Sequence, residues 1–138
     1  MNKKLTKDDL IQLGNLFEKQ YFDELNERLD GFLKLGDNAI LLNLKGATLI
    51  AQEKFFDAEK VLDHLVDKFD NFIDGEINLA NVYHKTNRSD IALAKLKELL
   101  LIDHLDTDTE QILNNNIGMI YNELSEYDEA LKYLSKAH

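Results

Sequence analysis

The segment INLANVYHKTNRSDIALAKL (77–96) contains the pattern that decides the fold. Its first half places Leu79 and Tyr83 four residues apart, and its second half does the same with Ala92 and Leu96. Apolar residues at this spacing lie on one face of an α-helix. The polar residues Asn87, Arg88 and Ser89 between the two halves indicate a turn. The segment therefore predicts a helix, a tight turn and a second helix.

The same pattern recurs along the chain. Moving the segment back by 34 residues, or forward by 38, brings small residues onto small residues and large apolar residues onto large ones. Small residues let the two helices of a hairpin approach closely, and their large neighbours fill the layer between hairpins. The equivalent positions are Gly46, Leu49, Ala58 and Leu62, then Ala80, Tyr83, Ala92 and Leu96, then Gly118, Tyr121, Ala130 and Leu134.

These copies resemble the tetratricopeptide repeat (TPR) family, whose period is 34 residues. A weaker copy precedes them, with Gly14 and Phe17 in its first helix and Leu25, Leu29 and Phe32 in its second. The resemblance implies an all-α, right-handed TPR solenoid of about four helix–turn–helix hairpins in a single domain. The expected limits are a divergent repeat 1 at 1–36, repeat 2 at 37–70, repeat 3 at 71–106, and repeat 4 at 107–138 without a capping helix.

Helix starts can also be read from the sequence. Thr6 with Asp9, Thr107 with Glu110, and Ser125 with Asp128 have the spacing of N-terminal capping residues. Either Asp37 or Asn38 is expected to cap the first helix of repeat 2. The chain lacks the tryptophan and the proline that are frequent in TPR family members, and neither absence threatens the fold.

Composition excludes several classes of function. The net charge is −10, which disfavours a nucleic-acid surface because binding phosphates requires clustered cations. The sequence contains no cysteine, no membrane-length apolar run and no secretory signal, so a cytoplasmic location is expected. The four histidines have no metal-binding spacing, and we found no catalytic set. We therefore expect no enzyme activity, no metal and no cofactor.

Asparagine is the informative residue type. Eight of the thirteen asparagines fall in the predicted first helices of the repeats, where the family's concave groove lies, although asparagine is a mediocre helix former. An amide side chain offers one acceptor and two donors, which can pair with the backbone of an extended peptide. The predicted groove residues are Asn15, Asn43, Asn78, Asn81, Lys85, Asn115, Asn116 and Asn122. The alternative is that an asparagine-rich composition merely solvates this face.

A further resemblance concerns the phrase FIDGEINLANVY, which is similar to repeats of the O-linked N-acetylglucosamine transferase type and of bacterial TPR proteins. In the transferase type an asparagine ladder holds the peptide. By that resemblance, Asn78 and Asn116 are the ladder positions, and Leu44 is the departure in repeat 2.

Three functions remain open. The first is a non-catalytic protein–protein interaction module that binds an extended peptide or partner segment in the groove. The second is the N-terminal substrate-recruiting region of a larger glycosyltransferase or sulfotransferase, and the third is a small acidic secretion-type chaperone. The sequence stops at the last predicted helix. It is either a fragment or an array whose end another copy covers, so we also expect that a homo-oligomer can form through this uncapped helix.

Overall fold

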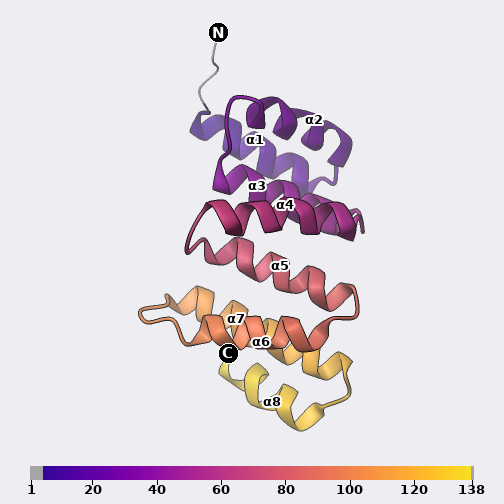
Figure 1. Cartoon of the computed structure of the whole chain (residues 1–138), viewed down its shortest axis with the longest axis vertical. Helices are drawn as coiled ribbons and strands as arrows, with labels where there is room; N and C mark the ends of the chain where they lie inside the picture. Colours follow the sequence, from indigo (N-terminus) through magenta and orange to yellow (C-terminus); the bar gives the residue numbers. More distant parts are fainter. Residues whose placement is uncertain (1–4, 138) are drawn as a thin grey trace. The chain divides into compact units, whose positions relative to one another are not determined.

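The computed structural model describes residues 5–137, and in this range the chain is all-α, as predicted. Figure 1 shows the helices in chain order, joined by short turns. Their bounds are α1 (Lys7–Glu18), α2 (Phe22–Leu33), α3 (Ala39–Ala51), α4 (Phe55–Lys68), α5 (Ile73–Lys85), α6 (Ser89–Leu100), α7 (Thr107–Glu123) and α8 (Tyr127–Lys136).

The chain forms two compact units that meet within α5, between Asn78 and Leu79. Unit 1 contains α1 to α4 and the start of α5, whereas unit 2 contains the rest of α5 and α6 to α8. Each unit is described separately below. The division into four repeats stays a prediction.

The core of unit 1 begins in the hairpin of α1 and α2. Leu13, Leu25 and Leu29 are buried there and pack with Leu41 of α3. Phe17 and Phe22 flank the α1–α2 turn and form an edge-to-face pair, with ring centroids 5.9 Å apart. The turn between these two helices is thus closed by an aromatic contact as well as by backbone geometry.

The α3–α4 hairpin depends on the close approach that the sequence predicted. A Cβ atom added to Gly46 would lie 2.5 Å from Leu62 Cδ2, so a larger residue at this position would require the Leu62 side chain to shift. Gly75 at the start of α5 has the same relation to Leu65 of α4, at 2.4 Å from its Cδ2. Sequence comparison did not single out Gly75, because it lies outside the repeated small position.

In unit 2 the equivalent contact joins α7 to α8. A Cβ on Gly118 would lie 2.6 Å from Leu134 Cγ and 3.2 Å from the backbone oxygen of Ala130. Beside this contact Tyr121 stacks on Tyr133 with centroids 5.8 Å apart. Lys97 of α6 donates a hydrogen bond to the Tyr121 hydroxyl, and this bond raises the pKa of the ammonium group above its ordinary value.

The predicted role of Gly14 is wrong. Although it occupies the small position of the first copy, a Cβ placed on it would meet nothing within 4 Å. The α1–α2 hairpin therefore does not use a glycine contact. Larger side chains, including Leu13 and Leu25, are buried in its core.

The turn inside each hairpin has one repeated geometry. A single non-glycine residue adopts a left-handed conformation, with φ between 59° and 64°, at Gln20, Glu53, Asn87 and Ser125. The N–H of the next residue donates to the carbonyl five residues earlier, at 2.8–2.9 Å, in all four turns. This is a Schellman motif, which normally has glycine at the left-handed position. None of these four turns has glycine there.

The predicted helix starts are confirmed in part. Thr6 and Asp9 form a reciprocal capping box at α1, and Asn38 caps α3 by accepting a hydrogen bond of 3.1 Å from the Leu41 N–H. The α7 cap is not Thr107 but Asp106, which accepts from the Thr109 N–H at 2.7 Å. That bond holds the pKa of the Asp106 carboxyl below its ordinary value.

Ser125 does not cap α8. The residue that precedes α8 is Glu126, and its side chain makes no capping hydrogen bond. Ser125 instead closes the end of α7 in the left-handed position. Among residues 5–137, no helix is long and apolar enough to cross a membrane.

Two matched glycine substitutions test the packing. Gly14→Ala should stabilise the chain by up to about 1 kcal/mol, because alanine is the better helix former and its Cβ enters open space. Gly118→Ala should destabilise it by about 1–3 kcal/mol, because the same methyl group meets Leu134 and the α8 backbone. Urea denaturation measures both values. Equal effects of the two substitutions would contradict the packing described for the α7–α8 hairpin.

The turn geometry generates a second test. Glu53→Gly should raise the free energy of unfolding by about 0.5–1 kcal/mol, because glycine adopts the left-handed conformation without the cost borne by other residues. Asn87→Gly is the control and should change it little, since asparagine tolerates this conformation. Thermal and urea denaturation read out both variants, and a destabilised Glu53→Gly protein would refute the turn assignment.

Candidate functional site

The eight predicted groove residues are divided between the two units. Unit 1 contains Asn15 on α1, Asn43 on α3 and Asn78 on α5; unit 2 contains Asn81 and Lys85 on α5 and Asn115, Asn116 and Asn122 on α7. Four of them are exposed and the other four are half-buried. The predicted ladder of Asn78 and Asn116 is split between the units and stays a prediction.

In unit 1 the structure pairs two of the predicted amides. Asn78 Nδ2 donates a hydrogen bond of 2.7 Å to Asn43 Oδ1, so an asparagine on α5 faces one on α3. In the repeat pattern the position equivalent to Asn78 is Leu44, and the observed partner Asn43 is the residue before it. The side-chain carbonyl oxygen of Asn78 and the side-chain NH2 group of Asn43 take no part in this hydrogen bond. The pair therefore keeps an acceptor and a donor side by side.

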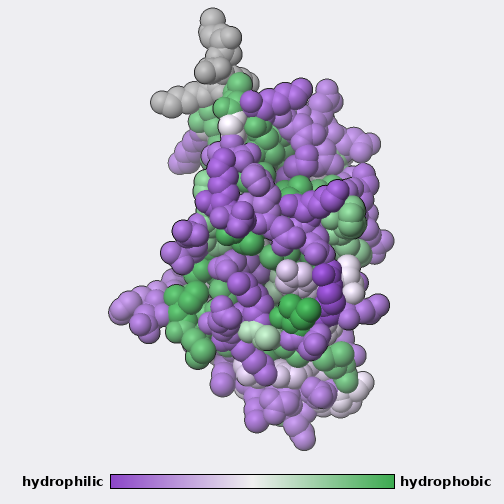
Figure 2. Space-filling model, viewed as in Figure 1, coloured by the Kyte–Doolittle hydropathy of each residue, from purple (hydrophilic) through white to green (hydrophobic). Residues whose placement is uncertain are grey.

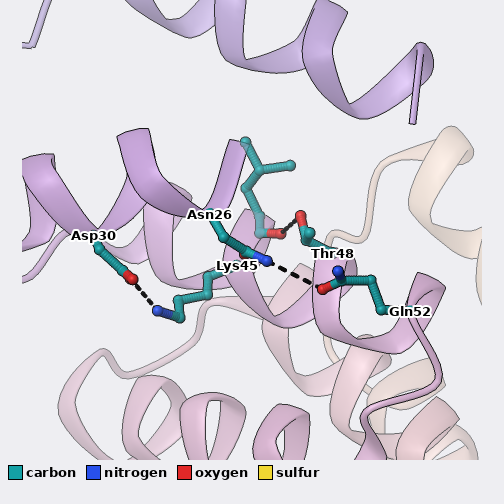
Figure 3. A network of polar contacts seen from close by, with 6 residues as sticks. Asn26, Asp30, Lys45, Thr48 and Gln52 are labelled. Carbon is teal, nitrogen blue, oxygen red and sulfur yellow. Dashed lines mark hydrogen bonds and ion pairs between the residues drawn. The ribbon is translucent and has the colours of Figure 1, made fainter. Parts of the chain in front are cut away.

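A polar network lies between α2 and α3 (Figure 3). Asn26 Nδ2 donates to Gln52 Oε1 at 3.1 Å, and Lys45 forms an ion pair with Asp30. Figure 3 shows both α2 side chains directed at the α3 side chains. The buried Thr48 hydroxyl donates to the Leu44 carbonyl of its own helix. The Asn26–Gln52 and Lys45–Asp30 contacts join two helices, so we assign them a structural role. The buried Asn26 Oδ1 has no hydrogen-bond partner.

Unit 2 presents a continuous row on α7. Ile112, Asn115, Met119 and Asn122 follow at intervals of three and four residues, which places them on one helical face. All four are exposed, and Asn115 Nδ2 contacts Met119 Sδ at 3.5 Å. We call this row the α7 face. Sequence reasoning selected its asparagines but missed its isoleucine and methionine, which read as ordinary core residues.

The neighbouring asparagines of α7 differ in environment. Asn116 is half-buried, whereas Asn114 is only 3% exposed and its carbonyl oxygen has no hydrogen-bond partner. Helix rotation explains the difference, since consecutive residues are about 100° apart around the axis. Of the three consecutive asparagines, only Asn115 is fully available to a ligand.

A shallow concavity of about 530 Å³ adjoins the α7 face. It is lined by Asp108, Gln111, Ile112 and Asn115 of α7 and by Ala137, which follows α8. A smaller concavity of about 260 Å³ lies over the first hairpin of unit 1, where Arg28 donates to Gln12 Oε1 at 2.9 Å. In unit 1 the polar groups of the concavity are therefore partly engaged with each other.

The structure assembles one further set of polar residues that the sequence did not reveal. His84 Nδ1 lies 2.8 Å from Ser89 Oγ, and His84 Nε2 bonds to Glu123. With both ring nitrogens bonded, the imidazole connects the end of α5 to the start of α6 and the end of α7. Within residues 5–137 no group of three or more histidine, aspartate or glutamate side chains is placed to hold a metal ion.

The last helix exposes apolar side chains. Tyr127 is 63% exposed and Leu131 66% exposed on α8. These side chains lie where the sequence predicts an uncovered final helix. Self-association through this helix stays a prediction.

Comparison with solved structures identifies the fold. The chain is similar to the crystal structure of MamA, with 21% identity and a TM-score of 0.71 over 94% of this chain and 75% of that one. It is also similar to YrrB, described as a TPR protein with an unusual peptide-binding site, with 20% identity and a TM-score of 0.69. That alignment covers 91% of this chain and 63% of YrrB. The chain therefore has the TPR fold.

Sequence searches give no such relation. No protein-family model matches the chain, and no curated protein matches it significantly. The likeness to MamA extends to a MamA double mutant, with 16% identity and a TM-score of 0.68 over 96% of this chain and 75% of that one. At these identities the comparisons establish the fold alone.

The Asn43–Asn78 hydrogen bond predicts an energetic coupling. In a double-mutant cycle of Asn43→Ala and Asn78→Ala, the two effects on the free energy of unfolding should differ from additivity by about 0.5–1.5 kcal/mol. The control is a second cycle in which Asn122→Ala, at an exposed position of α7, replaces Asn78→Ala. Its effect on the free energy of unfolding should add to that of Asn43→Ala. Additivity of the first pair would exclude the bond in solution.

Proposed function

We propose that the chain is a non-catalytic protein–protein interaction module that binds an extended peptide or partner segment through its asparagine amides. The observation that carries the proposal is the Asn43–Asn78 pair, which keeps one amide donor and one amide acceptor available at neighbouring positions. A peptide backbone presents a carbonyl and an N–H group in the same way. The proposed contact is a two-point hydrogen bond to the main chain of the ligand.

The hydrogen bond between the two asparagines supports this role energetically. Each amide is held in place before a ligand arrives, so binding orders fewer side-chain torsions and costs less entropy. Both side chains are half-buried, which weakens competition from water. Backbone pairing of this kind provides affinity without reading the ligand's side chains, which then have to be recognised elsewhere.

The known proteins of this fold give further support. YrrB is described as having a peptide-binding site, and we extend a peptide-binding role to this chain as a proposal. The absence of cysteine suits a cytoplasmic setting, which we include in the proposal. The roles in transferase recruitment and in secretion gain no supporting observation from the geometry.

Peptide selection tests the proposal. A random peptide library displayed on phage should yield ligands for the full chain. For the best of these peptides, Asn43→Ala with Asn78→Ala should weaken binding by about tenfold, because two hydrogen bonds of about 0.5–1.5 kcal/mol each are lost. Fluorescence polarisation measures the affinity, and circular dichroism verifies that the variant is folded.

The matched control is Glu27→Gln, an exposed position on α2. It should leave the affinity unchanged. A selected peptide that binds the double variant as tightly as the original chain would exclude the asparagine pair as the contact. A selection that yields no specific peptide would contradict the proposed function itself.

A further inference from the structure

The charge of unit 2 is distributed unevenly along its sequence. Residues 98–131 contain no lysine and no arginine, whereas they contain nine carboxylates. The nine are Glu98, Asp103, Asp106, Asp108, Glu110, Glu123, Glu126, Asp128 and Glu129. Helix α7 lies entirely in this stretch, and both of its ends are acidic.

The lysines that border this stretch are already engaged. Lys97 donates to Tyr121, Lys132 pairs with Glu129 at 3.1 Å, and the Lys136 ammonium lies 5.3 Å from the centre of the Tyr133 ring. In the part of the chain that the structure describes, Asp108 and Glu110 in the first turn of α7 have no ion-pair partner. The acidic start of α7 therefore retains an attraction for an external cation.

Exposed apolar side chains lie on the same face of α7 as Asp108, which precedes Ile112 by one helical turn. Ile112 is 47% exposed and Met119 52% exposed on the α7 face, while Leu113 and Ile117 on the opposite side of the helix are buried. Both exposed side chains are large and apolar, so they can pack against an aliphatic ligand group. Asn115 and Asn122 alternate with them along the face.

The concavity combines these features in one place. Asp108 supplies a carboxylate, Ile112 an apolar wall, and Gln111 and Asn115 supply amides. Figure 2 shows a surface on which hydrophilic residues predominate and hydrophobic residues form separate patches. An apolar pair bordered by acidic groups on such a surface suits a ligand with both aliphatic and cationic side chains.

We infer that the α7 face, with Asp108 at its N-terminal end, binds an extended peptide segment that carries lysine or arginine beside at least one large aliphatic residue. The inference rests on the proposed function and specifies the class of partner. Charge complementarity selects the basic residues, and the exposed Ile112 and Met119 select the aliphatic one. Ile112 to Asn122 spans about 15 Å of helix, which about five extended residues match.

Three synthetic peptides of about ten residues test the inference. The first alternates lysine and leucine with serine and glycine spacers, the second has glutamate in place of lysine, and the third has serine in place of leucine. Each carries fluorescein and is titrated with the full chain. The first peptide should bind at least about tenfold more tightly than the second, and about threefold more tightly than the third. Its affinity should fall as salt is added, because exposed charges are screened.

Two pairs of variants locate the contact. Asp108→Asn should weaken binding of the lysine–leucine peptide by about 1.5- to 5-fold, since one exposed ion pair contributes a factor of about that size. The matched control is Asp128→Asn, which removes the same charge from the first turn of α8. Ile112→Ser with Met119→Ser should also weaken binding. Its control is Ile91→Ser with Leu101→Ser, at two exposed apolar positions outside α7.

The outcomes separate this inference from the proposed function. Equal binding of the lysine and glutamate peptides, or α7 variants that behave as their controls, would overturn the inference. If in that case the double variant Asn43→Ala with Asn78→Ala still binds a library-selected peptide more weakly than the original chain does, the proposed function stands. Failure of all three synthetic peptides to bind would also overturn the inference, and the library selection then decides the proposed function alone.

Discussion

Close contact between the paired helices of a hairpin is the constraint on which this structure depends. Where Gly46 meets Leu62 and Gly118 meets Leu134, a Cβ atom could be added only if the leucine side chain shifted. Such contacts fix the rotation of each helix about its own axis, because only one face of the helix is narrow enough to enter them. The buried layer of leucine, isoleucine and valine follows from this fixed rotation.

The same constraint determines which residues remain available for recognition. With Gly118 turned toward α8, the four residues of the α7 face are turned outward. In unit 1 the rotation of α3 around Gly46 brings Asn43 to the side that faces Asn78 of α5. The candidate contact groups are thus a consequence of the hairpin packing and need no additional structural elements.

The geometry of the turns inside the hairpins is the second constraint on the structure. All four Schellman turns use a non-glycine residue in the left-handed conformation, which costs stability at Gln20 and Glu53 in particular. The cost is tolerated because the backbone hydrogen bonds at 2.8–2.9 Å and the neighbouring packing, such as Phe17 on Phe22, hold each turn. Short turns with one geometry keep the two helices of every hairpin antiparallel and adjacent.

The sequence by itself determined the helices, the turns and the positions of the glycine contacts in two hairpins. These features depend on neighbours within a few residues, so spacing alone reveals them. Only the tertiary structure decided that Asn78 pairs with Asn43, that Gly75 is a packed position and Gly14 is not, and that Asn114 is buried beside the exposed Asn115. Such partners depend on the offset and rotation of helices that are distant in sequence, and a repeat period accurate to one residue does not specify them.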